Sequence, residues 1–259
     1  MNSIVLARYS ESLDWISQIP EDFEVFIYNK GETITSPEVI RRADHIIDRP
    51  NVGRESETYL HHMMTNARAN SDFTVYAQGE PFTHSPDFIR LLENWRDWDD
   101  VQALSWQWRA DRNIPPLELL GWDELSLEGR LRVRPELFSL TNWGPLEFVD
   151  NGARNMGLVY RVIHGNLPDG TNIASHVLRR CKLDHLADKA DQHMAGVFSY
   201  GAIFAARNHR VAAVPQESLE LLREFATAEI AAHGYILERM WLHFFGQDFV
   251  RPKARLGGR

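Results

Sequence analysis

The chain has little cysteine and no long apolar run, and both absences narrow its class. Cys181 is the single cysteine among 259 residues, so no internal disulfide can form and nothing indicates an oxidising compartment. The N-terminal sequence reaches charged residues within a few positions, unlike a signal peptide, and no later apolar stretch is long enough to span a bilayer. These absences predict a cytoplasmic protein without a membrane span.

An excess of basic charge is absent as well. The formal net charge of −8 does not favour a broad nucleic-acid-binding face, although a local patch is compatible with it. The one basic cluster is the tail over residues 251–259, where Pro252 and two glycines separate the basic residues. A frayed, solvated terminus is the commoner meaning of such a tail, and contact with an anionic partner is the less common one.

Familiar catalytic fingerprints are also missing. The sequence contains no Walker loop, no dinucleotide-binding glycine pattern, no zinc spacing of cysteine and histidine, and no GxSxG element. What is present, 44% hydrophobic and 25% charged residues, is ordinary for one large globular domain. We expect a single domain over residues 1–259 with a tryptophan-rich insertion at about 98–192. Trp143 in that insertion is a candidate to stack on a sugar, although such tryptophans more often belong to the core.

The first hundred residues alternate between strand and helix patterns. Short apolar runs at 4–7, 23–28 and 73–77 predict buried strands. Helical spacing follows each run, over 11–19, over 37–47 behind the cap-like Ser36, over about 55–67, and over 85–95. This order predicts an α/β fold with a mostly parallel central sheet flanked by helices. Near the end, a strand over 197–206 interrupted at Tyr200 and Gly201 precedes two further helical patterns.

Ligands of mostly parallel sheets bind beyond the carboxyl ends of the strands. That rule selects three segments, residues 8–10, 29–31 and 78–80, which we expect to line one crevice. Asn29, Lys30 and Gly31 are candidates to hold a phosphate or a ribose, although a plain turn is the commoner meaning of such a sequence.

The segment Asn51-Val52-Gly53-Arg54-Glu55 combines a glycine, an arginine and the start of a helix. Free amides and the helix dipole favour an anion at that place, and a guanidinium binds phosphate with two hydrogen bonds. A helix start that is merely capped by Ser56 and Glu57 explains the sequence equally well.

Two glutamates are candidates for chemistry. Glu80 follows a buried strand in the segment Gln78-Gly79-Glu80 and would suit a hard divalent cation, although a solvated turn glutamate is the simpler explanation by residue type. Glu238 lies at the border of the buried face of the last helix, and periodicity alone favours an exposed, paired glutamate there.

Taken together, these segments resemble a family of domains of unknown function that is related to GT-A glycosyltransferases. The motifs that carry the resemblance are found in about the first ninety and the last sixty residues. They are ARY at 7–9, YNKG at 28–31, NVGRE at 51–55, QGEPF at 78–82, YGAIF at 200–204 and ERMW at 238–241.

The resemblance implies a GT-A-like sheet that binds a nucleoside diphosphate sugar at its carboxyl edge. It implies a divalent cation, Mn²⁺ or Mg²⁺, at Glu80, where this chain has one acid and the wider superfamily commonly has two. It also implies that Glu238 is the general base of an inverting transfer. The residues expected to hold the donor are Arg8, Asn29, Lys30, Gly31, Asn51, Gly53, Arg54 and Gln78.

Several functions remain open at this point. The acceptor of a transferred sugar is a glycan, a small molecule or, alternatively, a hydroxylated base in DNA, which would have to be flipped or single-stranded. A nucleotide-binding protein without catalysis is the alternative of another class, because Glu80 stands alone. A hydrolase or phosphotransferase ranks last, since the sequence offers no nucleophile for it.

Overall fold

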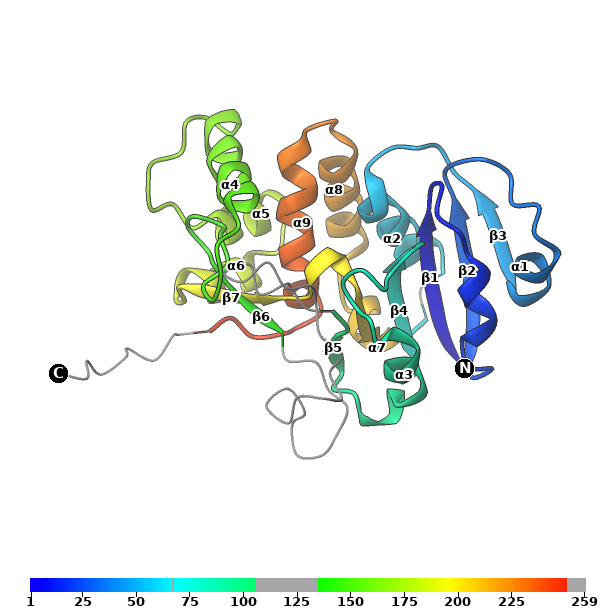
Figure 1. The fold of residues 1–259 in the computed structure, drawn as a ribbon. Coiled ribbons are helices and arrows are strands. Elements are labelled where there is room, and N and C mark those ends of the chain that lie inside the picture. The colour runs from blue at the N-terminus through cyan, green and yellow to red at the C-terminus, as the bar shows by residue number, and fades with distance from the viewer. Residues whose placement is uncertain (67, 106–134, 251–259) are drawn as a thin grey trace.

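The computed structural model describes residues 1–66, 68–105 and 135–250, and its centre is a six-stranded sheet (Figure 1). The strand order is β3-β2-β1-β4-β8-β5. The first four strands in that order are parallel, and β8 runs antiparallel to both β4 and β5. The predicted α/β class with a mostly parallel sheet is therefore confirmed. The strands are β1 (Asn2–Arg8), β2 (Phe23–Asn29), β3 (His45–Asp48), β4 (Phe73–Gln78), β5 (Val101–Ala103) and β8 (Phe204–Arg207).

Helices surround this sheet and extend beyond it. Figure 1 shows α9 between α8 on one side and α4 on the other, and α9 also packs against the second sheet, formed by β6 (Glu136–Ser139) and β7 (Ala195–Phe198). The α-helices are α1 (Pro37–Arg42), α2 (Arg54–Thr65), α3 (Phe88–Glu93), α4 (Asn151–Ile163), α5 (Ile173–Arg180), α6 (Asp184–Asp191), α7 (Asn208–Ala212), α8 (Gln216–Thr227) and α9 (Ala231–Phe244). Short 3-10 helices are η1 (Asp14–Gln18), η2 (Trp95–Asp97) and η5 (Tyr200–Ala202).

The predicted helix over 37–47 is wrong in its second half. Helix α1 ends at Arg42, and the following residues form β3, in which Ile46 pairs with Ile27 of β2. Asp44 fixes this change, because its carboxylate accepts a hydrogen bond from the Val25 amide at 2.7 Å and its own amide donates to the Val25 carbonyl. A helical spacing of apolar residues in so short a stretch is overridden when the chain can add a strand to a sheet.

The predicted strand over 197–206 divides at the position expected from Tyr200 and Gly201. Its two halves, β7 and β8, belong to different sheets, and η5 connects them. Gly201 has φ +65°, a left-handed backbone conformation that favours glycine. The chain therefore turns sharply here, next to the carboxyl end of β4.

The predicted insertion at about 98–192 contributes strands to both sheets. Strand β5 belongs to the main sheet, whereas residues 135–191 supply β6 and the helices α4 to α6. Trp143 is fully buried and its indole nitrogen donates to the Tyr235 carbonyl at 3.0 Å, so it is a core residue and not a sugar platform. Residues 106–134 and the basic tail 251–259 lie outside the described residues. Within the described part, no helix is long and apolar enough to cross a membrane.

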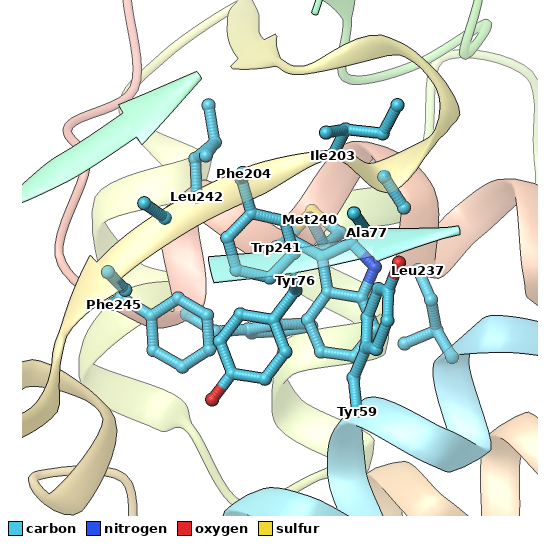
Figure 2. Packing of buried hydrophobic residues seen from close by; sticks show 14 of the residues in the cluster. Tyr59, Tyr76, Ala77, Ile203, Phe204, Leu237, Met240, Trp241, Leu242 and Phe245 are labelled. Carbon is cyan, nitrogen blue, oxygen red and sulfur yellow. The ribbon is translucent and has the colours of Figure 1, made fainter. Parts of the chain in front are cut away.

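An aromatic cluster joins the last helix to the sheet (Figure 2). Phe204 of β8 stacks on Tyr76 of β4 with ring centroids 4.9 Å apart and on Trp241 of α9 at 5.7 Å. Tyr59 of α2 lies 5.7 Å from Trp241. Large aromatic rings bury much apolar area in fixed geometry, so this cluster sets where α2 and α9 lie against the sheet. Because Glu238 lies one turn before Trp241 on α9, the cluster also fixes the position of Glu238.

Candidate functional site

The carboxyl ends of the parallel strands meet at one edge, as predicted. Arg8 pairs with Asn29 across β1 and β2, Ala7 pairs with Gln78 across β1 and β4, and Asn29 pairs with Asp48 across β2 and β3. The three sequence segments that were expected to line one edge therefore lie side by side.

The loops after β1 and β2 are tied to each other by the predicted donor-binding residues. Arg8 Nη1 donates to Asn29 Oδ1 at 2.6 Å and to the Glu32 carbonyl, and Asn29 Nδ2 donates to Asp48 Oδ1 at 2.9 Å. Gly31 lies so close that a Cβ at this position would be 1.8 Å from the Tyr9 carbonyl oxygen. The side chains of Arg8 and Asn29 thus hold this edge together by hydrogen bonds. Gly31 allows the two loops to come close because it has no side chain.

Lys30 points away from solvent, with 4% of its side chain exposed. Its ammonium donates to the carbonyls of Val52 and Arg54 and forms an ion pair with Glu57 Oε2 at 3.2 Å. Two carbonyl acceptors and one carboxylate thus surround the ammonium group. Lys30 therefore holds the turn at 51–55 from its buried side. We call Lys30, Glu57 and their contacts the brace of this turn.

Glu57 is the centre of this brace. Its side chain is fully buried and is held by Arg49 at 2.6 Å and Arg223 at 3.2 Å in addition to Lys30. Burial acts to raise the pKa of Glu57, but the bonds from Arg49 and Lys30 outweigh it and hold the pKa below its usual value. The carboxylate is charged at neutral pH and neutralises part of the basic charge around it.

The turn itself leaves groups free. Gly53 has φ +61° and precedes α2 without any side-chain cap, and Arg54 also has a left-handed φ of +50°. Within the described residues the side chains of Asn51 and Arg54 are exposed and form no hydrogen bond or ion pair. The Arg54 side chain runs past Gly234 of α9, where a Cβ would lie 3.9 Å from Arg54 Cδ. The Glu55 amide donates to its own carboxylate, and no N-cap side chain bonds to this helix start. A helix start beside an unpaired guanidinium forms a setting that favours an anion.

The predicted base, Glu238, is connected to the end of β4 through one residue, Gly201. Gln78 Nε2 donates to the Gly201 carbonyl at 3.0 Å, and the Gly201 amide donates to Glu238 Oε1 at 3.0 Å. Oε2 of Glu238 has a 3.5 Å contact with Arg239 Nη1, too long to be strong. One carboxylate oxygen is thus fixed in direction, and the other is largely available.

Arg239 compensates the negative charge near Glu238. Its side chain is 1% exposed, pairs with Asp150 Oδ2 at 3.1 Å and lies over the ring of Phe198 at 4.6 Å. Asp150 in turn caps α4 by accepting from the Ala153 amide. A buried arginine with these partners holds α9 to α4 and leaves Glu238 partly exposed, with 16% of its side chain accessible.

Glu55 is a residue of this site that the sequence analysis left without a role. Arg54 approaches Gly234, and Tyr59 contacts Trp241, so the register of α2 against α9 brings Glu55 toward Glu238. Burial and the Glu238 carboxylate both raise the pKa of Glu55. The sequence feature that could have identified Glu55 as a site residue is its position at the end of the NVGRE motif, on the first turn of a helix.

Glu80 is directed into its own turn. Its Oε1 accepts from the Phe82 amide at 3.1 Å, and its Oε2 accepts from the Thr83 hydroxyl at 2.8 Å. Among the described residues no group of three or more histidine, cysteine, aspartate or glutamate side chains is placed to hold a metal ion. Glu80 therefore does not bring together the set of oxygens that Mg²⁺ or Mn²⁺ prefers, and its metal role stays a prediction.

Comparisons of the chain with family models, curated proteins and solved structures gave no match. What the chain does has to be inferred from the arrangement of its own residues.

Proposed function

We propose that the chain is a glycosyltransferase with a GT-A-like sheet, which moves a sugar from a nucleoside diphosphate sugar to an acceptor hydroxyl. The observation that carries the proposal is the placement of Glu238. A carboxylate from the end of the chain lies at the edge where β1, β2 and β4 finish, held by the Gly201 amide and joined through it to Gln78. A base with one fixed and one available oxygen at a ligand-binding edge suits removal of a hydroxyl proton.

The start of α2 would hold the diphosphate of the donor. Four cationic side chains surround this turn, and they outnumber its two carboxylates, Glu55 and Glu57. The cations are Lys30, Arg49, Arg54 and Arg223. The amides at the start of α2, apart from that of Glu55, and the Arg54 guanidinium would contact the phosphate oxygens, and Asn51 lies exposed in the same turn. Lys30 would contribute by fixing the carbonyls of that turn.

The chemical step needs one proton transfer and one displacement. Glu238 Oε2 would take the proton of the acceptor hydroxyl while the hydroxyl oxygen forms a bond to the anomeric carbon. The bond from that carbon to the diphosphate oxygen breaks, and the diphosphate leaves with the electron pair. Arg54 and the amides of α2 stabilise the charge that develops on the leaving group. Attack opposite the leaving group inverts the anomeric configuration.

The wider resemblance includes a divalent cation at the diphosphate, and Glu80 is the residue predicted to hold it. Because the Glu80 carboxylate is engaged by Phe82 and Thr83, none of the steps above passes through a metal. A requirement for Mn²⁺ or Mg²⁺ remains a prediction that the screen below tests.

A thermal-shift screen of nucleoside diphosphates and their sugar conjugates, each with and without Mn²⁺, tests the proposal. A ligand at about a hundred times its dissociation constant stabilises the folded protein by roughly 2.7 kcal/mol. We expect one nucleotide to raise the melting temperature, and its conjugate to support transfer to a glycan or small-molecule acceptor. The absence of a shift with every nucleotide would contradict the proposal.

The same screen distinguishes the alternatives. Donor binding without transfer or hydrolysis, across acceptors and metals, would favour a nucleotide-binding protein without catalysis. Transfer to DNA that contains a hydroxylated base, but not to glycans or small molecules, would identify the other acceptor class.

A further inference from the structure

The junction of α2 with α9 contains polar groups for which the proposed reaction gives no use. Arg54 passes Gly234 and the Tyr59 ring lies 5.7 Å from Trp241, so Glu55, between Arg54 and Tyr59, lies opposite Glu238. Glu55 is partly exposed, and its carboxylate accepts a hydrogen bond from its own backbone amide. In the described part of the chain no other side chain forms a hydrogen bond or an ion pair with it. A second carboxylate beside the base is therefore available for a ligand.

Two buried polar atoms without partners belong to the two helices that carry this carboxylate pair, and one of them, the Tyr59 hydroxyl, lies near Glu55. The Tyr59 side chain is 0% exposed and that of Trp241 is 1% exposed, and neither the Tyr59 hydroxyl nor the Trp241 Nε1 has a hydrogen-bond partner among the described residues. Side chains on a helix lean toward its N-terminus, so Tyr59 reaches back over the turn of Glu55 and Trp241 over the turn of Glu238. In Figure 2 both polar atoms point toward Leu237, the neighbour of Glu238.

Buried donors without partners cost folding free energy, and proteins normally pair them. Here both belong to the helices that carry Glu55 and Glu238. The Glu55 side chain, which no other side chain holds, can turn aside and let a ligand group reach them. The two orphaned atoms are thus a second and independent sign of a ligand at this place, in addition to the two carboxylates.

The mixture of groups selects the chemical class of the ligand. A metal cation would be disfavoured by the Trp241 N–H and by the nearby Arg54 guanidinium, and an anion would be repelled by Glu238. Sugar hydroxyls both donate and accept, so they can donate to carboxylates and accept from Tyr59 and Trp241. Burial and the Glu238 carboxylate raise the pKa of Glu55.

We propose that Glu55, with Tyr59 and Trp241 behind it, binds adjacent hydroxyls of a neutral sugar ring next to Glu238. The inference rests on the proposed function and names the substrate class of the same site. The ring comes either from the transferred sugar of the donor or from a sugar acceptor, and these two sources share the chemistry.

Calorimetric titration of the full chain tests this inference. Four probes are compared: a nucleoside diphosphate, its sugar conjugate, a methyl glycoside and Mn²⁺ alone. For the wild type we expect the conjugate, or else the methyl glycoside in the presence of the nucleotide, to bind with an extra affinity that depends on the sugar. Glu55→Gln should reduce that extra affinity about tenfold and leave the affinity for the bare nucleotide unchanged. Glu224→Gln on the exposed side of α8 is the matched control and should change neither.

Tyr59→Phe separates binding from folding. Removing a buried hydroxyl that has no partner should leave the melting temperature unchanged or higher, while the sugar-dependent affinity falls. A purely structural role for Tyr59 would predict the reverse pattern, a lower melting temperature with the sugar-dependent affinity intact.

The outcomes separate the inference from the proposed function. Nucleotide binding with no sugar-dependent gain, or with a gain that Glu55→Gln leaves intact, overturns the inference alone. Binding of Mn²⁺ that is lost in Glu55→Gln also overturns it, because the carboxylates would then form a cation site. If neither nucleotide nor sugar binds, both the inference and the proposed function fall.

Discussion

Two regions at the same edge of the sheet use their polar side chains in opposite ways. In the loops after β1 and β2, Arg8 and Asn29 bond to each other and to neighbouring carbonyls. At the junction of α2 with α9, Arg54 is exposed and unpaired, and Glu238 has one oxygen largely available. Side chains whose hydrogen bonds are completed within the protein fix the backbone, whereas those left incomplete are the groups that can bind a ligand.

The largest expected effect on activity is that of Glu238→Gln, which changes the available carboxylate at the junction of α2 with α9. The amide oxygen of glutamine can still accept from the Gly201 amide, so the backbone should stay in place while the proton acceptor is lost. We expect turnover to fall by roughly 10²–10⁴-fold, with donor affinity nearly unchanged. Single-turnover kinetics with the donor found by the screen measure this, and wild-type turnover in the variant would remove Glu238 as the base.

Lys30→Met should mainly reduce stability. It leaves the carbonyls of Val52 and Arg54 without their donor and removes one of the three cations around the buried Glu57. Breaking a buried ion pair costs about 3–5 kcal/mol, and because Arg49 and Arg223 remain we expect a loss of about 3 kcal/mol. Urea unfolding measures it. A loss below about 1 kcal/mol would show that the brace is not important to the fold.

Arg54→Met should show the opposite behaviour. The side chain has no partner within the described residues, so stability should change by no more than about 0.5 kcal/mol. A charged hydrogen bond to phosphate contributes about 1.5–3 kcal/mol, which predicts roughly a 10–100-fold loss of nucleoside diphosphate affinity. Arg41→Met on the exposed side of α1 is the matched control. Unchanged affinity in Arg54→Met would move the diphosphate away from α2.

The smallest effect concerns pH and lies away from the site. His233 Nδ1 donates to the Phe225 carbonyl at 2.7 Å, so its Nε2 accepts from His164 Nε2 at 3.0 Å, and both rings are neutral in this pair. Burial and the nearby Arg180 lower the pKa of His164 to about 4, and burial also lowers that of His233.

Because these pKa values lie below the unfolded value near 6.5, the unfolded chain binds more protons at acid pH. Stability from the pair is complete above about pH 6.5 and is lost as the pH falls from 6.5 toward 4. Since His164 is partly exposed, we expect only about 1 kcal/mol from it. Unfolding of His164→Gln across that range should show a flatter pH dependence than the wild type, and an identical slope would contradict the assignment.

The sequence predicted most of the frame for physical reasons that are local. Apolar runs such as 4–7 and 73–77 became β1 and β4 because buried parallel strands need unbroken apolar residues. The turn at Gly201 was visible because few other residues accept its backbone conformation. The failure at 43–47 is equally physical, because pairing with β2 outweighed a helical pattern only a few residues long.

For the candidate site, the sequence indicated which segments meet at the carboxyl edge, because the alternation of strands and helices predicts strands that run in the same direction. It also marked Arg54 and Glu238 as candidates for donor binding and for the base. The tertiary structure alone decided how each polar side chain is used. Lys30 turned inward because Glu57 and two carbonyls surround it, and Glu55 came to face Glu238 because the Tyr59 and Trp241 rings set the register of two helices distant in the chain. Hydrogen-bond partners and helix registers of this kind depend on contacts between remote segments, which no local pattern of residues encodes.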